Sequence, residues 1–197
     1  MGYLTPPVND AWKQTLTETA YTPDVSVQLE LKNGEAIVFD LDRIAKGFVK
    51  GLYGDKIVSS CDAFISKNDD LFFIEFKNQR IANIKSNELA AKALGSLLVA
   101  QLAFFPQRSL EALSDHSHLF VVYKDQDLKG EPDYYKKIMG TFAPLANLPK
   151  EPIQFGLRRY LNCGLYHEIH TISVSHFNEF YLSLIHISEP TRPISIS

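Results

Sequence analysis

The segment that most constrains the fold of this chain is residues 71–77, where aromatic and branched apolar side chains follow one another almost without interruption. Such side chains favour strands, and a strand that is apolar on both faces must be covered on both sides. Residues 84–105 follow with leucines and alanines at helical spacing, up to Pro106. A second apolar strand is predicted at residues 118–124. Strand, long helix and strand in this order predict a parallel crossover and therefore an α/β fold.

Upstream of this unit the sequence predicts a β-hairpin and a helix. Residues 25–31 alternate apolar and polar side chains, Asn33-Gly34 is a turn dipeptide, and residues 36–39 are apolar. This order is typical of a hairpin with positive φ at the two turn positions. Asp40 or Asp42 can cap the helix that follows, because a carboxylate before the first turn accepts hydrogen bonds from free backbone N–H groups.

A second predicted hairpin carries the polar residues that matter most. Residues 61–65 predict a strand, residues 66–70 are rich in turn-forming side chains, and residues 71–77 form the partner strand. The long helix is expected to begin with Asn83 or Ser86 as its cap. Further elements are predicted toward the C-terminus: a short helix at 134–139, an edge strand at 155–160, a final strand at 165–174 and a helix from 175 to 181.

Composition places the chain among globular proteins. Of its 197 residues, 45% are hydrophobic and 22% are charged, the balance of a folded domain rather than of a disordered chain. No stretch reaches the roughly 18 to 20 uncharged apolar residues of a membrane span, and residues 1–10 lack the pattern of a secretory signal. Cys61 and Cys163 do not resemble a disulfide framework, although a cross-link between them stays open, so a cytoplasmic location is the expectation. We expect one α/β domain with a mixed central sheet at residues 25–181, behind an N-terminal arm at 1–24.

The C-terminal segment has a different character from the rest of the chain. Residues 182–192 resemble the in-frame translation of a sequencing adapter. The resemblance implies that residues 182–197 are a non-native tail, and that the natural sequence departs from this one near Tyr181. The prediction of the fold therefore does not include the tail.

The strongest chemical pattern is a pair of carboxylates with a lysine. Glu75 and Lys77 are two positions apart on a predicted strand, so both side chains leave the same face, while Phe76 points into apolar packing on the other. Pairing through the predicted hairpin places Asp62 beside them. Two converging carboxylates repel each other unless a cation lies between them, and hard oxygen ligands favour Mg²⁺ or Mn²⁺. The alternative is an ordinary ion pair between Glu75 and Lys77 at a solvated sheet end.

These residues resemble the motif of the PD-(D/E)xK nuclease superfamily. Cys61-Asp62 stands where the family usually has Pro-Asp, and Glu75-Phe76-Lys77 matches the second part of the motif. The likeness covers residues 41–124 and includes the order of hairpin, long helix and strand. It implies a restriction-endonuclease-like fold. By the same resemblance, Asp62, Glu75 and the carbonyl of Phe76 are metal ligands. Lys77 is then the catalytic lysine.

Basic residues after the motif fit a nucleic-acid substrate. Arg80, Lys85 and Lys92 follow the strand end and the first turns of the long helix, where they could hold phosphates beside the metal. A solvated helix face explains the lysines as well. Many members of the family add an acidic ligand from an upstream helix, for which Glu30 and Asp42 are only weak candidates. The net charge of −3 supplies no general attraction for nucleic acid, so any basic groove must be local.

Two histidine pairs resemble metal sites but lack a complete ligand set. His167 and His170 do not have the spacing of zinc proteases, whose two histidines are four apart on a helix, and they fall on a predicted strand. His116 and His118 share a strand face, but no cysteine or acidic cluster near them completes a site. We therefore expect structural roles for these histidines.

Three functional hypotheses follow from these patterns. The first is a small Mg²⁺- or Mn²⁺-dependent nuclease that acts on nucleic acid, with DNA expected rather than RNA. The second is a nuclease-like fold without catalysis, serving as a binding or immunity module, which the acidic net charge and the weak helix carboxylate favour. The third is hydrolysis of small phosphoesters with the same metal. Relatives of this fold often pair to cut two strands, so an oligomer is compatible with the resemblance.

Overall fold

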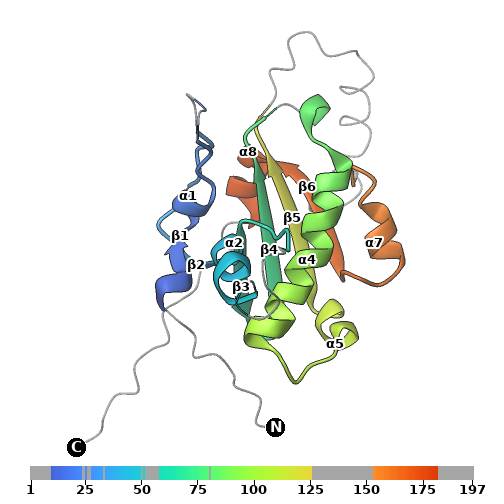
Figure 1. Cartoon of the computed structure of the whole chain (residues 1–197). Coiled ribbons are helices and arrows are strands. Elements are labelled where there is room, and N and C mark those ends of the chain that lie inside the picture. Colours follow the sequence, from blue (N-terminus) through green and yellow to red (C-terminus); the bar gives the residue numbers. More distant parts are fainter. Residues whose placement is uncertain are drawn as a thin grey trace, which may run out of the picture.

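One mixed sheet of six strands forms the centre of the structure, in the order β1-β2-β3-β4-β5-β6 (Figure 1). The computed structural model describes residues 10–23, 25, 28–32, 34–49, 51, 58–79, 81–125 and 153–181. The strands are β1 (Lys13–Thr15), β2 (Ile37–Asp40), β3 (Ala63–Lys67), β4 (Asp70–Lys77), β5 (Ser117–Tyr123) and β6 (Glu168–Ser173). Neighbours from β1 to β4 are antiparallel, whereas β4, β5 and β6 are parallel. The predicted α/β class and mixed sheet are confirmed.

Helices cover both faces of this sheet. They are η1 (Asp10–Trp12), α1 (Leu16–Thr19), α2 (Leu41–Ile44), η2 (Ala45–Val49), η3 (Ile81–Asn83), α4 (Ser86–Phe104), α5 (Leu110–Ser114), α7 (Arg158–Asn162), α8 (Val174–His176) and η4 (Phe177–Tyr181). The longest, α4, connects β4 to β5 across one face of the sheet (Figure 1), which confirms the predicted strand, helix and parallel strand. Within the described part of the chain, no helix has both the length and the apolar character needed to cross a membrane.

A two-residue turn fixes how β3 and β4 pair. Asn68 and Asp69 have φ values of 51° and 71°, the left-handed conformation that short polar side chains tolerate and that tight hairpins require. The pairing runs from Lys67↔Asp70 to Ala63↔Ile74, and Ala63 is the first residue of β3. The last three residues of β4 therefore extend beyond their antiparallel partner. The predicted hairpin is confirmed, with a turn shorter than the predicted one.

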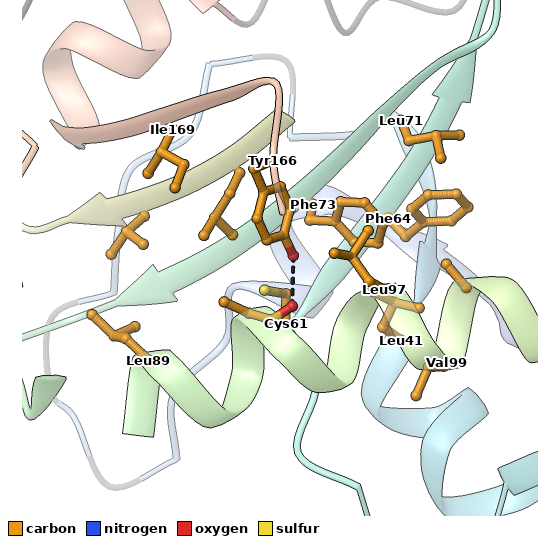
Figure 2. Packing of buried hydrophobic residues seen from close by; sticks show 14 of the residues in the cluster. Leu41, Cys61, Phe64, Leu71, Phe73, Leu89, Leu97, Val99, Tyr166 and Ile169 are labelled. Atoms are coloured by element: carbon orange, nitrogen blue, oxygen red, sulfur yellow. Dashed lines mark hydrogen bonds between the residues drawn. The ribbon is translucent and has the colours of Figure 1, made fainter. Parts of the chain in front are cut away.

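Alternation along β4 divides the core between the two faces of the sheet. Phe73 faces α4 and packs on Phe64, with ring centroids 5.1 Å apart (Figure 2). On the same side, the buried hydroxyl of Tyr166 donates a hydrogen bond of 2.7 Å to the carbonyl of Ala93 in α4. Phe76 belongs to the core on the other face. Glu75 and Lys77, which alternate with Phe76, must therefore lie on the α4 face.

The predicted first hairpin is wrong. The described residues of segment 25–31 contain no strand, and β2 pairs instead with β1, inside the segment predicted to be an arm. The side chain of Gln28 explains part of the difference, because its amide donates to the carbonyls of Thr22 and Val25 and its oxygen accepts from the N–H of Thr22. Local bonds of this kind compete with a sheet ladder for the backbone groups.

Several element boundaries also differ from the predictions. The N-cap of α4 is Lys85, without a side-chain cap, rather than Asn83 or Ser86. The predicted edge strand at 155–160 is wrong, because Phe155 and Gly156 have φ values of 57° and 67°, which end any extended run before α7. Two predictions are confirmed: the Asp40 cap of α2, and helical turns after β6. The predicted helix at 134–139 and the tail at 182–197 lie outside the described residues.

Candidate active site

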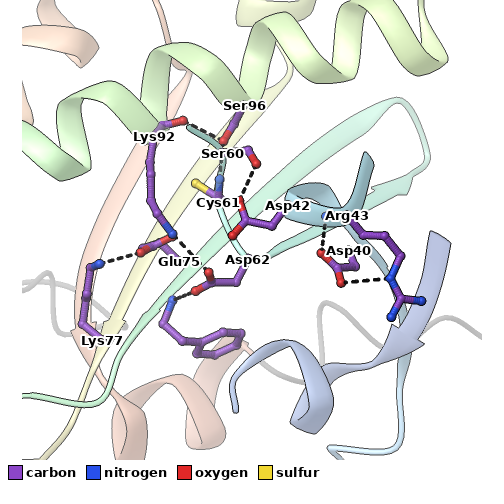
Figure 3. Close-up of polar contacts among 11 residues, drawn as sticks. Asp40, Asp42, Arg43, Ser60, Cys61, Asp62, Glu75, Lys77, Lys92 and Ser96 are labelled. Carbon is purple, nitrogen blue, oxygen red and sulfur yellow. Dashed lines mark hydrogen bonds and ion pairs between the residues drawn. The ribbon is translucent and has the colours of Figure 1, made fainter. Parts of the chain in front are cut away.

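The last residues of β4 extend beyond β3, and Asp62 lies beside them. Asp62 comes just before β3, and its Oδ2 accepts a hydrogen bond of 2.7 Å from the N–H of Phe76 (Figure 3). The carbonyl of Lys77 accepts instead from the N–H of Lys124, on the β5 side. Because the N–H and C=O of one strand residue point to the same edge, the carbonyl of Phe76 also faces the side where Asp62 lies. The hairpin thus brings together the carboxylate and carbonyl that the sequence predicted.

Glu75 and Lys77 lie on one face, as the alternation predicts. The Nζ atom of Lys77 is 2.8 Å from Oε1 of Glu75, and the Glu75 side chain is only 1% exposed. Although this ion pair is close, Oε1 accepts no hydrogen bond of regular geometry from a described residue. A carboxylate buried this deeply is costly unless cations compensate its charge. The ion pair is therefore not the solvated one that the alternative interpretation requires.

Lys92 supplies the second cation, from α4. Its Nζ atom lies 2.7 Å from Oε2 of Glu75 and 3.1 Å from Oδ1 of Asp62 (Figure 3). The sequence predicted Lys92 to hold the substrate backbone beside Lys85, but the structure directs its side chain into the site. Lys85 is 70% exposed and forms a salt bridge with Glu88, 3.1 Å away. Arg80, the third predicted contact, lies outside the described residues.

Ser96 fixes α4 against the segment that carries Asp62. Its hydroxyl accepts a hydrogen bond of 2.7 Å from the N–H of Cys61 and donates one of 2.7 Å to the carbonyl of Lys92. Gly95, next to it, passes so close that a Cβ atom at this position would lie 1.9 Å from the carbonyl oxygen of Ser59. These contacts hold the backbone at Lys92 close to the segment that carries Asp62.

Asp42, one of the two weak candidates for an upstream acidic residue, borders the site. Since Asp40 caps α2, the carboxylate of Asp42 is free to accept a hydrogen bond of 2.7 Å from the hydroxyl of Ser60 (Figure 3). Its charge also raises the pKa of Lys92, as the smallest of several causes. Glu30, the other candidate, lies beside η4, where its backbone carbonyl accepts a hydrogen bond of 2.7 Å from the side chain of Asn178. Asp42 therefore belongs to the surroundings of the carboxylate pair.

Burial and ion pairing shift the pKa values of Asp62 and Lys92 in opposite directions. Burial raises the pKa of the Asp62 carboxyl from 3.8 to about 8, and Glu75 adds to the increase, while Lys92 and the N–H of Phe76 oppose it. Burial alone would lower the pKa of Lys92, but the carboxylates of Asp62 and Glu75 outweigh it and hold that pKa above its ordinary value. Of these two groups, Asp62 is therefore the one that titrates near neutral pH.

The raised pKa of Asp62 predicts that stability falls as the pH rises. The folded state binds this proton more tightly than the unfolded state, whose aspartate has a pKa of about 3.9, so the contribution is complete below about pH 4. It is lost as the pH rises toward about 8. Asp62→Asn cannot titrate, so the free energy of unfolding of the parent, relative to this variant, should fall over that interval. Urea unfolding of both proteins at each pH measures it, and a difference that does not change with pH would contradict the raised pKa.

The donor atoms of the site fit a hard divalent cation. Asp62, Glu75 and the carbonyl of Phe76 offer oxygen only, which suits Mg²⁺ or Mn²⁺, and Mg²⁺ commonly keeps several water ligands beside one or two carboxylates. Among the described residues, no three side chains of the types His, Cys, Asp and Glu gather closely enough to hold a metal ion. Two carboxylates and a carbonyl are therefore the set that this chain brings together.

The histidines and cysteines singled out in the sequence lie elsewhere. His118 and His170 stand at the starts of β5 and β6, with ring nitrogens 3.4 Å and 3.1 Å from Oε2 of Glu168. Parallel pairing brings Glu168 directly opposite His118, and Asp70 lies 3.7 Å from the His118 ring. Cys61 is buried and Cys163 exposed, and both are free thiols, so the cross-link between them is not formed.

We compared the chain with known protein families, curated proteins and solved structures. No protein family, no curated protein and no solved structure matches the chain. The function must therefore be inferred from the geometry and chemistry of the site itself.

Proposed function

We propose that this protein is a metal-dependent nuclease of the PD-(D/E)xK type, which hydrolyses phosphodiester bonds in nucleic acid, with DNA as the expected substrate. One observation carries the proposal. Asp62, just before β3, and Glu75, in β4, converge at the open end of one hairpin, where two lysine ammonium groups lie within 3.1 Å of their oxygens. Charged groups are not placed in a core without compensation or a function.

Each residue has a definite role in this proposal. Asp62, Glu75 and the carbonyl of Phe76 would hold Mg²⁺ or Mn²⁺. When bound, such an ion polarises the phosphate and lowers the pKa of a water ligand. Lys77, at 15% side-chain exposure, is open enough to orient the attacking water and to offset negative charge that develops on the phosphate. Lys85, exposed at the start of α4, can contact the substrate backbone.

A second function is favoured by one specific observation. The ammonium of Lys92 contacts both carboxylates, Lys77 adds a second positive charge at Glu75, and Glu75 is almost fully buried. If the lysines of the site compensate its carboxylates, no metal is needed. This arrangement suits a nuclease-like fold acting as a binding or immunity module. Metal binding at Asp62 and Glu75 separates the two functions, because the binding module requires none.

The experiment that tests the proposal is cleavage of plasmid and single-stranded DNA, with and without Mg²⁺ or Mn²⁺. We expect metal-dependent cleavage that falls by about 10² to 10⁴-fold in Lys77→Ala, since a residue that positions or deprotonates water contributes on this scale. Lys13→Ala is the matched control, because Lys13 pairs with Asp10 at the far edge of the sheet. Circular dichroism checks that each variant is folded. A folded parent that cleaves neither DNA with either metal would favour the binding module.

A further inference from the structure

Lys92 occupies the place where a metal ion would bridge the two carboxylates. A single atom, Nζ, is within hydrogen-bond distance of both Oδ1 of Asp62 and Oε2 of Glu75. A Mg²⁺ ion held by the same two oxygens would need both of them free of the ammonium, because Mg–O bonds of about 2.0 to 2.1 Å are shorter than either N···O contact. An ammonium and a divalent cation cannot share the space between these oxygens, because they would overlap and repel each other. Metal binding and the observed position of Lys92 therefore exclude each other.

We propose that Lys92 is an internal counter-ion of the site, which must leave the carboxylates before a divalent cation binds and is then free to contact a phosphate. This inference rests on the proposed function, since it assumes a metal at Asp62 and Glu75. It adds a counter-ion role to the phosphate contact that the sequence predicted for Lys92. The metal-free protein is stable because the lysine compensates the carboxylates, and metal affinity is reduced by the cost of removing it.

The surroundings of Lys92 allow the side chain to move while its backbone stays in place. The carbonyl of Lys92 is held by Ser96, whose hydroxyl also binds the N–H of Cys61. The side chain itself is 20% exposed, so its long, flexible stem reaches the surface of the cluster. Displacement therefore requires rotations within one side chain and no shift of α4.

A displaced ammonium also finds an acidic neighbour. Glu88 precedes Lys92 by one helical turn, and the charge of Lys92 already contributes to the lowered pKa of Glu88, after the larger effects of Lys85. A glutamate one turn before a lysine is the favourable order for a pair on a helix surface. Glu88, at 48% side-chain exposure, can thus receive the ammonium at the rim of the site, where a substrate phosphate would compete for it.

Titration calorimetry with Mn²⁺ tests this inference without relying on activity. We expect Lys92→Met, which keeps the apolar stem and removes the charge, to bind Mn²⁺ about 10-fold or more tightly than the parent, because close buried charge pairs have coupling energies of at least this size. Lys13→Met is the control. It removes the same charge from the far edge of the sheet, where Lys13 pairs with Asp10, and we expect its affinity to stay within about twofold.

The outcomes separate the inference from the proposed function. If parent and Lys92→Met bind Mn²⁺ equally, and Asp62→Asn abolishes binding in both, the metal site stands and the counter-ion role is overturned. If folded samples of both bind no Mn²⁺, the proposed function fails, and the inference fails with it. Lys92→Gln keeps hydrogen-bond donors and serves if Lys92→Met does not fold. For either variant, Mn²⁺ should raise the midpoint of thermal unfolding more than it does for the parent.

Discussion

Replacing Glu75 by alanine is expected to abolish metal-dependent cleavage and to lower the free energy of unfolding by about 3 to 5 kcal/mol. The stability effect arises because Glu75 contacts both ammonium groups of the site, Lys77 at 2.8 Å and Lys92 at 2.7 Å. Without it, Lys77 loses the carboxylate beside it, and Lys92 keeps only the contact of 3.1 Å with Asp62. Breaking a buried ion pair from one side leaves a charge uncompensated, and that penalty exceeds the small net gain of forming the pair.

The two effects of Glu75→Ala can be measured separately. Urea unfolding followed by circular dichroism gives the free energy, and cleavage is assayed under conditions in which the variant remains folded. Glu75→Gln keeps the volume and removes the charge, so it should lose cleavage as fully as the alanine variant. Asp10→Ala is the control for an ordinary surface pair, since Asp10 is 91% exposed beside Lys13, and it should leave the urea midpoint of unfolding unchanged. Parental stability in Glu75→Ala would show that the cluster is not a connected ionic network.

Gly95→Ala should destabilise the protein by about 3 kcal/mol, although alanine is the better helix former. At an ordinary helical position the exchange stabilises by about 1 kcal/mol. Here the added methyl group would lie 1.9 Å from the carbonyl oxygen of Ser59 and 2.7 Å from a side-chain carbon of Val58. A backbone carbonyl cannot rotate away, so α4 and the segment before β3 must move apart, and overpacking of this kind is costly. Chemical denaturation measures the loss.

The same substitution should weaken the site. The segment that α4 would push away carries Cys61 and Asp62, and its bond to Ser96 would lengthen. We therefore expect reduced cleavage under conditions in which the variant is fully folded. Gly47→Ala is the matched control: outside its own helical turn, no atom of the described residues lies within 4 Å of the added methyl group, and the change should be neutral or stabilising. Equal stability of the two variants would mean that the close approach at Gly95 does not affect the free energy of unfolding.

The sequence predicted the hairpin half of the site because local rules govern it. Strand alternation places Glu75 and Lys77 on one face, and the turn residues bring Asp62 beside them. Each of these relations depends on neighbours along a strand or across one turn. The metal and the nuclease activity stay predictions, since they depend on ligands and reactions beyond the fold.

The role of Lys92 could not be predicted from helix geometry. Spacing along the helix puts Lys92 on a face with Lys85, but it does not say which of two long, flexible side chains will be drawn toward buried carboxylates. That choice is set by the contact between α4 and the sheet, where Glu75 needs compensation. Asp42 was only a weak candidate for a related reason, because Asp40 and Asp42 are equally plausible caps until packing selects one.

The two-residue turn of the β3–β4 hairpin makes this protein unusually intolerant of length changes at one exposed point. Insertions at turn tips are commonly neutral, because such residues contact little else. Here the turn at Asn68 and Asp69 sets which residue of β3 stands opposite each residue of β4, and this alignment continues to Ala63↔Ile74, next to Asp62. One added residue that shifts the alignment would move Asp62 along the strand by roughly 3.3 Å and send alternate side chains to the wrong face. The permitted length of this turn is therefore determined at the opposite end of the hairpin.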